Sequence, residues 1–207
     1  MLHKEIFSDE QTKLLPLVQK FKRKFYLVGG TAIALYIGHR RSIDFDLFTL
    51  GKIKKQSIKR LIDRHKYPVS GILFEDSEQL HLVIHDVKLT FFSFPYRIDA
   101  PTDFDQIVHI PDLLTLAAMK AYALGGRAKW KDYVDLYILL RDHFSLAQIS
   151  EKSKDLFSAY YNEKLFREQL CYFQDIDYSE KVDFVVQPVS DEEIKQFLTN
   201  VATTPFR

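Results

Sequence analysis

The apolar residues of this chain follow different patterns in its two halves. Short apolar runs with polar breaks predict strands in the first half, over residues 25–28, 43–49, 69–74, 80–84 and 87–94. Helical spacing predicts helices there over 9–22, 31–37 and 54–65. Past Pro95 only helical spacing remains, over 111–124, 129–143, 145–161, 163–173 and a short helix after Ser190. The pattern predicts an α/β fold, a small mixed sheet with flanking helices followed by a helical C-terminal half.

Residues with strong backbone preferences refine these boundaries. Ser8 and Gln11 have the spacing of a capping box, which predicts a helix start. Pro16 is expected to kink or split that helix, because proline removes a backbone donor. We place a domain boundary after the loop-like stretch that follows the last strand. This gives an α/β core over 1–105 and a helical region over 106–207.

The composition is that of an ordinary globular protein and excludes few functions. With 29 Lys and Arg against 28 Asp and Glu, the net charge of +1 neither favours nor excludes nucleic acid as a partner. A local basic cluster at Lys52–Arg60 either guides a polyanion such as tRNA or forms a solvated face. The single cysteine, Cys171, excludes an intrachain disulfide. Without an apolar signal segment or an apolar run of about 18 residues, we expect a cytoplasmic protein with no membrane partner.

Two short motifs in the first half carry chemistry. An apolar run ends at Gly29-Gly30, and an Asp-x-Asp pair begins at Asp44 inside a second apolar run. Residues two apart on a strand share a face, so Asp44 and Asp46 aim two carboxylates at one point. A glycine turn before a helix suits phosphate, and paired carboxylates suit Mg²⁺. Each motif alone also has a structural reading, as an ordinary strand–helix turn or a solvated strand face.

The order of these residues resembles a known group of enzymes. Gly29-Gly30, followed by the motif G-H-R-x-S-x-D-x-D over 38–46, is similar to the nucleotidyltransferase superfamily of the DNA polymerase beta type. More narrowly, it resembles the AbiEii/AbiGii toxin family. The resemblance implies that Asp44 and Asp46 are catalytic and hold Mg²⁺, with an NTP as substrate. It also implies nucleotide-binding roles for Gly29, Gly30, Thr31, Arg41 and Ser42.

Three charged residues stand out in the helical half. Lys120 is a lone cation in an apolar helix, so it faces a cleft or an anion, or it snorkels at the helix edge. Asp132 and Asp135 share a helix face, or they complement the helix dipole. The resemblance assigns Lys120 to the triphosphate and a catalytic or organising role to Asp132, with Asp135 structural. On this reading the helical region closes the nucleotide cleft.

One residue that the superfamily leads us to expect is missing. Many of its enzymes have a third carboxylate on a later strand, and the matching run 87–94 contains none. Thr90 stands where that carboxylate is expected. Three readings stay open: two aspartates suffice, Asp86 or Asp132 substitutes, or catalysis is weakened. Nucleotide and metal binding are therefore more secure expectations than catalysis.

These motifs together favour one function over two alternatives. The favoured function is Mg²⁺-dependent transfer of a nucleoside monophosphate from an NTP to an acceptor hydroxyl, on tRNA or on a protein. The resemblance implies the toxin component of a toxin–antitoxin or phage-defence system, with a cognate antitoxin as partner. The alternatives are a small-molecule nucleotidyltransferase and a non-catalytic nucleotide-binding module on the same fold.

Overall fold

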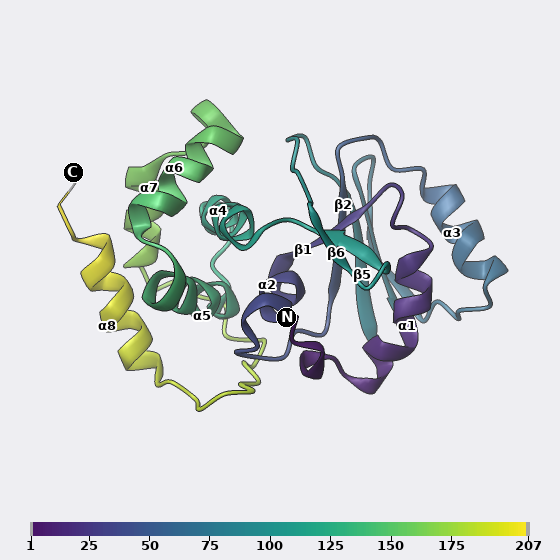
Figure 1. The fold of residues 1–207 in the computed structure, drawn as a ribbon, viewed down its shortest axis with the longest axis horizontal. Helices are drawn as coiled ribbons and strands as arrows, with labels where there is room; N and C mark the ends of the chain where they lie inside the picture. The colour runs from purple at the N-terminus through teal and green to yellow at the C-terminus, as the bar shows by residue number, and fades with distance from the viewer. Residues whose placement is uncertain (1, 206–207) are drawn as a thin grey trace. The chain divides into compact units, whose positions relative to one another are not determined.

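The computed structural model describes residues 2–205. The chain folds as two compact units, Met1–Asp112 and Leu113–Arg207. The described strands all lie in the first unit, whereas the second is built from helices and irregular segments (Figure 1). The predicted α/β fold with a helical C-terminal region is therefore confirmed.

The first unit contains a seven-stranded mixed sheet in the order β3-β4-β5-β2-β1-β7-β6. The strands are β1 (Tyr26–Val28), β2 (Phe45–Thr49), β3 (Gly71–Glu75), β4 (Gln79–Ile84), β5 (Val87–Ser93), β6 (Thr102–Phe104) and β7 (Val108–Ile110). The pairs β2–β5 and β1–β7 are parallel, and the other neighbours are antiparallel. Strand β6 corrects the prediction of a loop up to residue 105. The sequence Thr-Asp-Phe of β6 has no apolar run, and the segment is a strand because it pairs with β7.

The helices of the first unit include α1 (Asp9–Gln19), α2 (Gly29–Ile37) and α3 (Lys55–Arg64), preceded by a short 3₁₀ turn at Lys4–Ile6. The capping box of Ser8 and Gln11 at the start of α1 is confirmed. Helix α1 runs through Pro16 without interruption, so the expected split is wrong. Pro16 is exposed on α1, where its missing donor costs no buried contact. Both α1 and α3 lie on one side of the sheet (Figure 1).

The two faces of the sheet differ in character. On the face covered by the segment after α1, Phe21 and Phe25 pack against Phe91 of β5, with ring centroids 4.8 and 5.3 Å apart. On β4, Leu80, Leu82 and Ile84 are buried, and the alternate residues are partly exposed. The same alternation on β2, β4 and β5 places polar residues on the second face, namely His81, Lys88, Thr90 and Asp46. We call these four residues the polar face.

The second unit consists of α4 (Leu113–Leu124), α5 (Trp130–Ile138) with a π-helical turn (Leu139–His143), α6 (Leu146–Phe157) with a 3₁₀ turn (Ser158–Tyr160), α7 (Glu163–Leu170) and α8 (Asp191–Ala202). Ser145 caps α6 and Ser190 caps α8. The predicted helix over 163–173 ends three residues early. Across residues 2–205, no helix combines the length and the apolar character needed to cross a bilayer.

Candidate functional site

The glycine turn lies against a carboxylate. Strand β1 ends at Val28, and Gly29 begins α2 with a φ of +73°. A Cβ atom placed on Gly29 would overlap Oδ2 of Asp46. A Cβ on Gly30 would lie 2.5 Å from an Arg40 guanidinium nitrogen. Glycine is therefore favoured at Gly29 by its left-handed φ, whereas a side chain at Gly30 would require the Arg40 guanidinium to shift. The backbone that starts α2 passes directly beside the Asp46 side chain.

This tight turn yields a prediction about stability and binding. Replacing Gly29 with alanine is expected to lower the free energy of unfolding by at least about 1–2 kcal/mol, because a left-handed φ disfavours a side chain. It should also reduce stabilisation by Mg²⁺-NTP, since the new Cβ displaces the Asp46 carboxylate. Chemical denaturation and thermal shift measure the two effects. Gly71→Ala is the matched control, because nothing lies within 4 Å of a Cβ there. Equal behaviour of the two variants would contradict this account.

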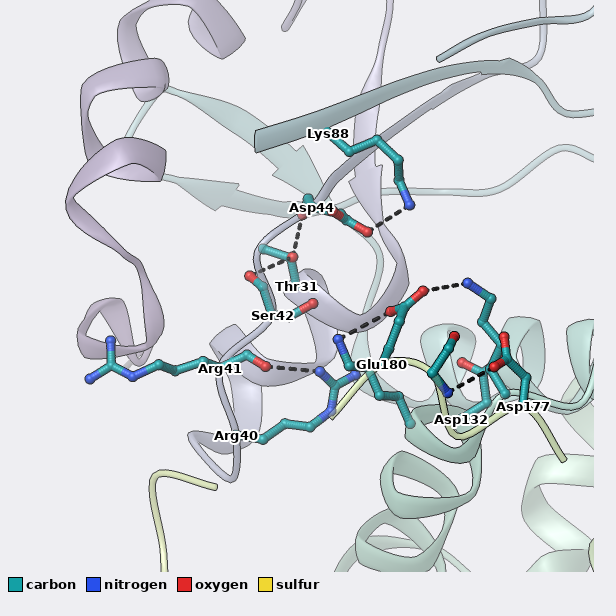
Figure 2. Close-up of polar contacts among 12 residues, drawn as sticks. Thr31, Arg40, Arg41, Ser42, Asp44, Lys88, Asp132, Asp177 and Glu180 are labelled. Carbon is teal, nitrogen blue, oxygen red and sulfur yellow. Dashed lines mark hydrogen bonds and ion pairs between the residues drawn. The ribbon is translucent and has the colours of Figure 1, made fainter. Parts of the chain in front are cut away.

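Thr31 anchors the chain that leads to the aspartates. Its hydroxyl is buried and donates to the backbone carbonyls of Ser42 and Asp44 (Figure 2). The Ser42 carbonyl also accepts from Gln11 Nε2 at 2.8 Å. Of the residues predicted to bind nucleotide, Thr31 is thus placed to hold the loop that precedes β2. Arg41 is exposed.

A buried arginine that no sequence motif marks as inward-facing lies beside the turn. Arg40 is 2% exposed, although its neighbour Arg41 points to solvent. Its Nη1 donates to the Arg41 carbonyl at 2.9 Å (Figure 2). A guanidinium close to Gly30 adds fixed positive charge next to the backbone expected to hold phosphate. A double-arginine motif on a loop carries no signal that tells which side chain turns inward.

The two aspartates lie at the start of β2. Asp44 directly precedes the strand, and Asp46 is its second residue, opposite Val28 of β1 and Thr90 of β5. The carboxylate of Asp44 pairs with Lys88 Nζ at 2.7 Å, and both side chains are about a third exposed or less (Figure 2). The structure therefore brings Gly29, Gly30 and both aspartates together, and adds Lys88, a cation that is not among the predicted site residues.

The register of β5 shows what faces Asp46 in place of a third carboxylate. Thr90 lies directly opposite Asp46, and His81 of β4 lies directly opposite Thr90. Residues opposite one another on neighbouring strands share a face, so the three side chains form a row. Burial lowers the pKa of His81, and the charge of Lys88 lowers it further, whereas Asp46 acts in the opposite direction. The row favours a neutral histidine beside the carboxylates.

The donor atoms present fit a divalent cation only in part. Asp44 and Asp46 offer the carboxylate oxygens that Mg²⁺ prefers. Within residues 2–205, no group of three or more His, Cys, Asp and Glu side chains is arranged to hold a metal. Two carboxylates can still bind Mg²⁺ when phosphate oxygens and water complete its coordination. The site thus suits a metal that arrives with a nucleotide better than a permanently bound one.

The second unit contains a buried charge network. Lys120 of α4 lies 2.5 Å from Asp132 Oδ1 and 2.9 Å from Asp135 Oδ2 of α5, and all three side chains are at most 5% exposed. Arg127 Nε bonds Asp132 Oδ2 at 3.0 Å. Burial raises the pKa of Asp132, but the charges of Lys120 and Arg127 outweigh it and hold the pKa below its usual value. Asp132 and Asp135 were predicted to share a helix face, and both pair with Lys120.

Hydrogen bonds and ion pairs hold the irregular segment between α7 and α8 against the start of α5. Between α7 and α8, Asp177 forms a backbone bridge with Lys129, just before α5. Glu180 accepts from Lys129 at 2.5 Å and pairs with Lys131 at 3.1 Å. These lysines lower the pKa of Glu180 to about 2, chiefly through the bond from Lys129. Figure 2 labels Asp177, Glu180 and Asp132 within this part of the second unit.

Comparison with known proteins identifies the family. Residues 17–206 match the family described as nucleotidyl transferase AbiEii toxin, type IV TA system. An uncharacterized protein of Aquifex aeolicus is 30% identical over 190 residues, which cover 85% of this chain and 89% of that protein.

Solved structures share the fold. MenT4, a nucleotidyltransferase toxin from Mycobacterium tuberculosis, has a TM-score of 0.64 at 12% identity, over 93% of this chain and 80% of that one. JHP933 from Helicobacter pylori has a TM-score of 0.55 at 17% identity, over 98% and 92% of the two chains. The family match covers nearly the whole chain and includes the glycine turn, both aspartates and the Lys120 network. The chain therefore belongs to the AbiEii family of nucleotidyltransferase toxins of type IV toxin–antitoxin systems.

Proposed function

We propose that this enzyme transfers a nucleoside monophosphate from an NTP to an acceptor hydroxyl on tRNA or on a protein. The acceptor oxygen forms a bond to the α-phosphorus, and the bond from the α-phosphorus to the β-bridging oxygen breaks. Pyrophosphate leaves, and the hydroxyl proton passes to solvent. Bound Mg²⁺ would neutralise charge on the triphosphate and on the leaving pyrophosphate.

One observation supports this proposal most strongly. The backbone at Gly29 passes close to the Asp46 carboxylate, so the N–H groups that we propose to hold phosphate lie beside a carboxylate that could hold Mg²⁺. In the proposal, Asp44 and Asp46 hold Mg²⁺, and the start of α2 holds the phosphate oxygens.

The proposal gives the buried network of the second unit an organising role. An effective general base has a pKa near the working pH, whereas Lys120 and Arg127 hold the pKa of Asp132 below its usual value. Asp132 is therefore a poor proton acceptor and a stable anion. We propose that Lys120 holds the Asp132 side chain in place, in addition to any contact that it makes with the triphosphate.

A specific observation also favours the non-catalytic alternative. Thr90 faces Asp46 where a third carboxylate is expected, and Lys88 already neutralises Asp44. Both features reduce the negative charge that would hold a second metal ion. A nucleotide-binding module with slow or no turnover would retain this arrangement.

The deciding experiment follows label from an NTP into product. Each of the four α-³²P-labelled NTPs is incubated with tRNA, with cell lysate protein, or with small hydroxylated compounds, in the presence of Mg²⁺. Labelled RNA or protein supports the proposal, and a labelled small molecule supports the small-molecule alternative. Mg²⁺-dependent NTP binding by calorimetry, without label in any product, would establish the non-catalytic reading. Adding the cognate antitoxin tests whether it suppresses the labelling.

Lys88 gives a separate prediction about metal dependence. In Lys88→Met, the ammonium that pairs with the Asp44 carboxylate is removed, so Mg²⁺ should bind that carboxylate more tightly. We expect the Mg²⁺ concentration that gives half of the NTP-induced thermal shift to fall by about tenfold, or about 1.4 kcal/mol. Lys59→Met is the matched control, because Lys59 forms a similar ion pair with Glu75 at 2.7 Å. An unchanged Mg²⁺ midpoint in Lys88→Met would rule out this competition.

A further inference from the structure

The first unit has a concave feature formed by residues other than those of the proposed transfer site. A cavity of about 550 Å³ lies between the turn after α1, residues 20–25, and the segment from β2 into α3, residues 49–61. Thr49 lines this cavity and is three positions from Asp46 on β2, so their side chains point to opposite faces of the sheet. A ligand in the cavity would thus not occupy the polar face.

The cavity wall carries charge of one sign. Its charged lining residues are Lys20, Arg23, Lys24, Lys52 and Lys54. The described lining includes no acidic residue. On α3, by contrast, Lys55 and Lys59 pair with Glu75 at 3.5 and 2.7 Å. Within the basic cluster at Lys52–Arg60, Lys55 and Lys59 are therefore paired with an acid, whereas Lys52 and Lys54 line the cavity.

The floor of the cavity is apolar. Phe21, Ile58 and Leu61 line it, and its volume lies within the roughly 300–1,000 Å³ of small-ligand sites. Helix α3 starts in its wall, and the N-cap residue Lys54 makes no capping bond with its side chain. The positive end of the helix dipole adds to the five cations. An apolar floor under a cationic rim suits a flat apolar body that carries phosphates.

We propose that this cavity binds a phosphorylated nucleotide unit, from a free nucleoside polyphosphate or from an RNA strand. The phosphates meet the five cations, and the base covers the apolar floor. This binding site is distinct from the proposed transfer reaction and does not depend on it. If the source is RNA, the cavity binds the strand without a metal ion.

The test measures binding with the full chain. A fluorescein-labelled single-stranded RNA of about 12 nucleotides is titrated in EDTA at several salt concentrations, and anisotropy reports the affinity. In the double variants Arg23→Ala/Lys24→Ala and Lys52→Ala/Lys54→Ala, we expect at least a tenfold loss of affinity at low salt. The slope of log affinity against log salt should fall by about 0.7 for each cation removed.

Controls separate this site from the transfer site and from general charge. Lys55→Ala/Lys59→Ala removes two cations of α3 that pair with Glu75, and it should keep the wild-type slope. Asp46→Asn should keep RNA affinity while losing Mg²⁺-dependent NTP stabilisation. Competition by ATP in EDTA identifies a free nucleotide as the source, and absence of competition identifies the RNA strand. Unchanged affinity in the cavity variants would overturn the proposal, as would tighter binding of a glutamate-rich peptide.

Discussion

Replacing Asp46 with asparagine is expected to lower nucleotidyl transfer by about 10²- to 10³-fold or more. Asparagine keeps the shape of the side chain but removes the charge that would hold Mg²⁺ beside the Gly29 turn. Because the amide fits the same space, the fold should be retained. The Mg²⁺-dependent part of the NTP-induced thermal shift should fall together with the rate of label transfer.

The matched control for this variant is Asp63→Asn, an exposed aspartate on α3 outside the polar face. It should transfer label at the wild-type rate. Asp44→Asn should behave like Asp46→Asn, although Lys88 then also loses its 2.7 Å partner. If Asp46→Asn labelled product as fast as wild type, the proposed site would be wrong, whatever the fate of the cavity proposal.

Replacing Lys120 with methionine is expected to destabilise the protein by about 3–5 kcal/mol. The change leaves Asp132 and Asp135 buried without the ammonium that lies 2.5 and 2.9 Å from them. Methionine has a similar volume, so lost packing is a minor part of the effect. Urea denaturation followed by circular dichroism measures the change in the free energy of unfolding.

A second substitution separates charge from packing at this position. Lys120→Met/Asp135→Asn removes one of the two buried carboxylates that have lost the ammonium, so it should be more stable than Lys120→Met alone. Lys164→Met is the control, because its pair with Glu168 is exposed and spans 3.8 Å. The control should cost at most about 0.5 kcal/mol. A loss in Lys120→Met no larger than in the control would show that the network contributes nothing to stability.

Much of the fold could be predicted from local sequence. The apolar runs locate strands β1 to β5, and the capping residue Ser8 fixes the start of α1, because these signals act within a few neighbours. Strands β6 and β7 are not among the predicted strands, because their pairing depends on partners rather than on their own pattern. Pro16 did not interrupt α1, because its position on the exposed side tolerates a missing donor.

The candidate site was predictable only as far as its linear motifs reach. Gly29 and the two aspartates are read directly from spacing. Their neighbour Lys88 comes from β5, and only the strand register shows that it lies beside Asp44. The buried state of Arg40 and the double pairing of Lys120 likewise depend on tertiary packing. The chemistry of a site is thus partly decided by residues that no local pattern marks.

The tight turn between β4 and β5 has a consequence for how this site can change. His85 and Asp86 both adopt left-handed φ angles, +50° and +60°, so the connection is two residues long and pairs Ile84 with Val87. Adding or deleting one residue in this turn would shift the pairing register of β5 by one residue. Lys88 and Thr90 would then face the core, and Leu89 would lie among the carboxylates. The length of the β4–β5 turn thus decides which β5 side chains lie beside the aspartates. Single substitutions can change the charge of this site without altering the turn, whereas insertions and deletions in the turn cannot.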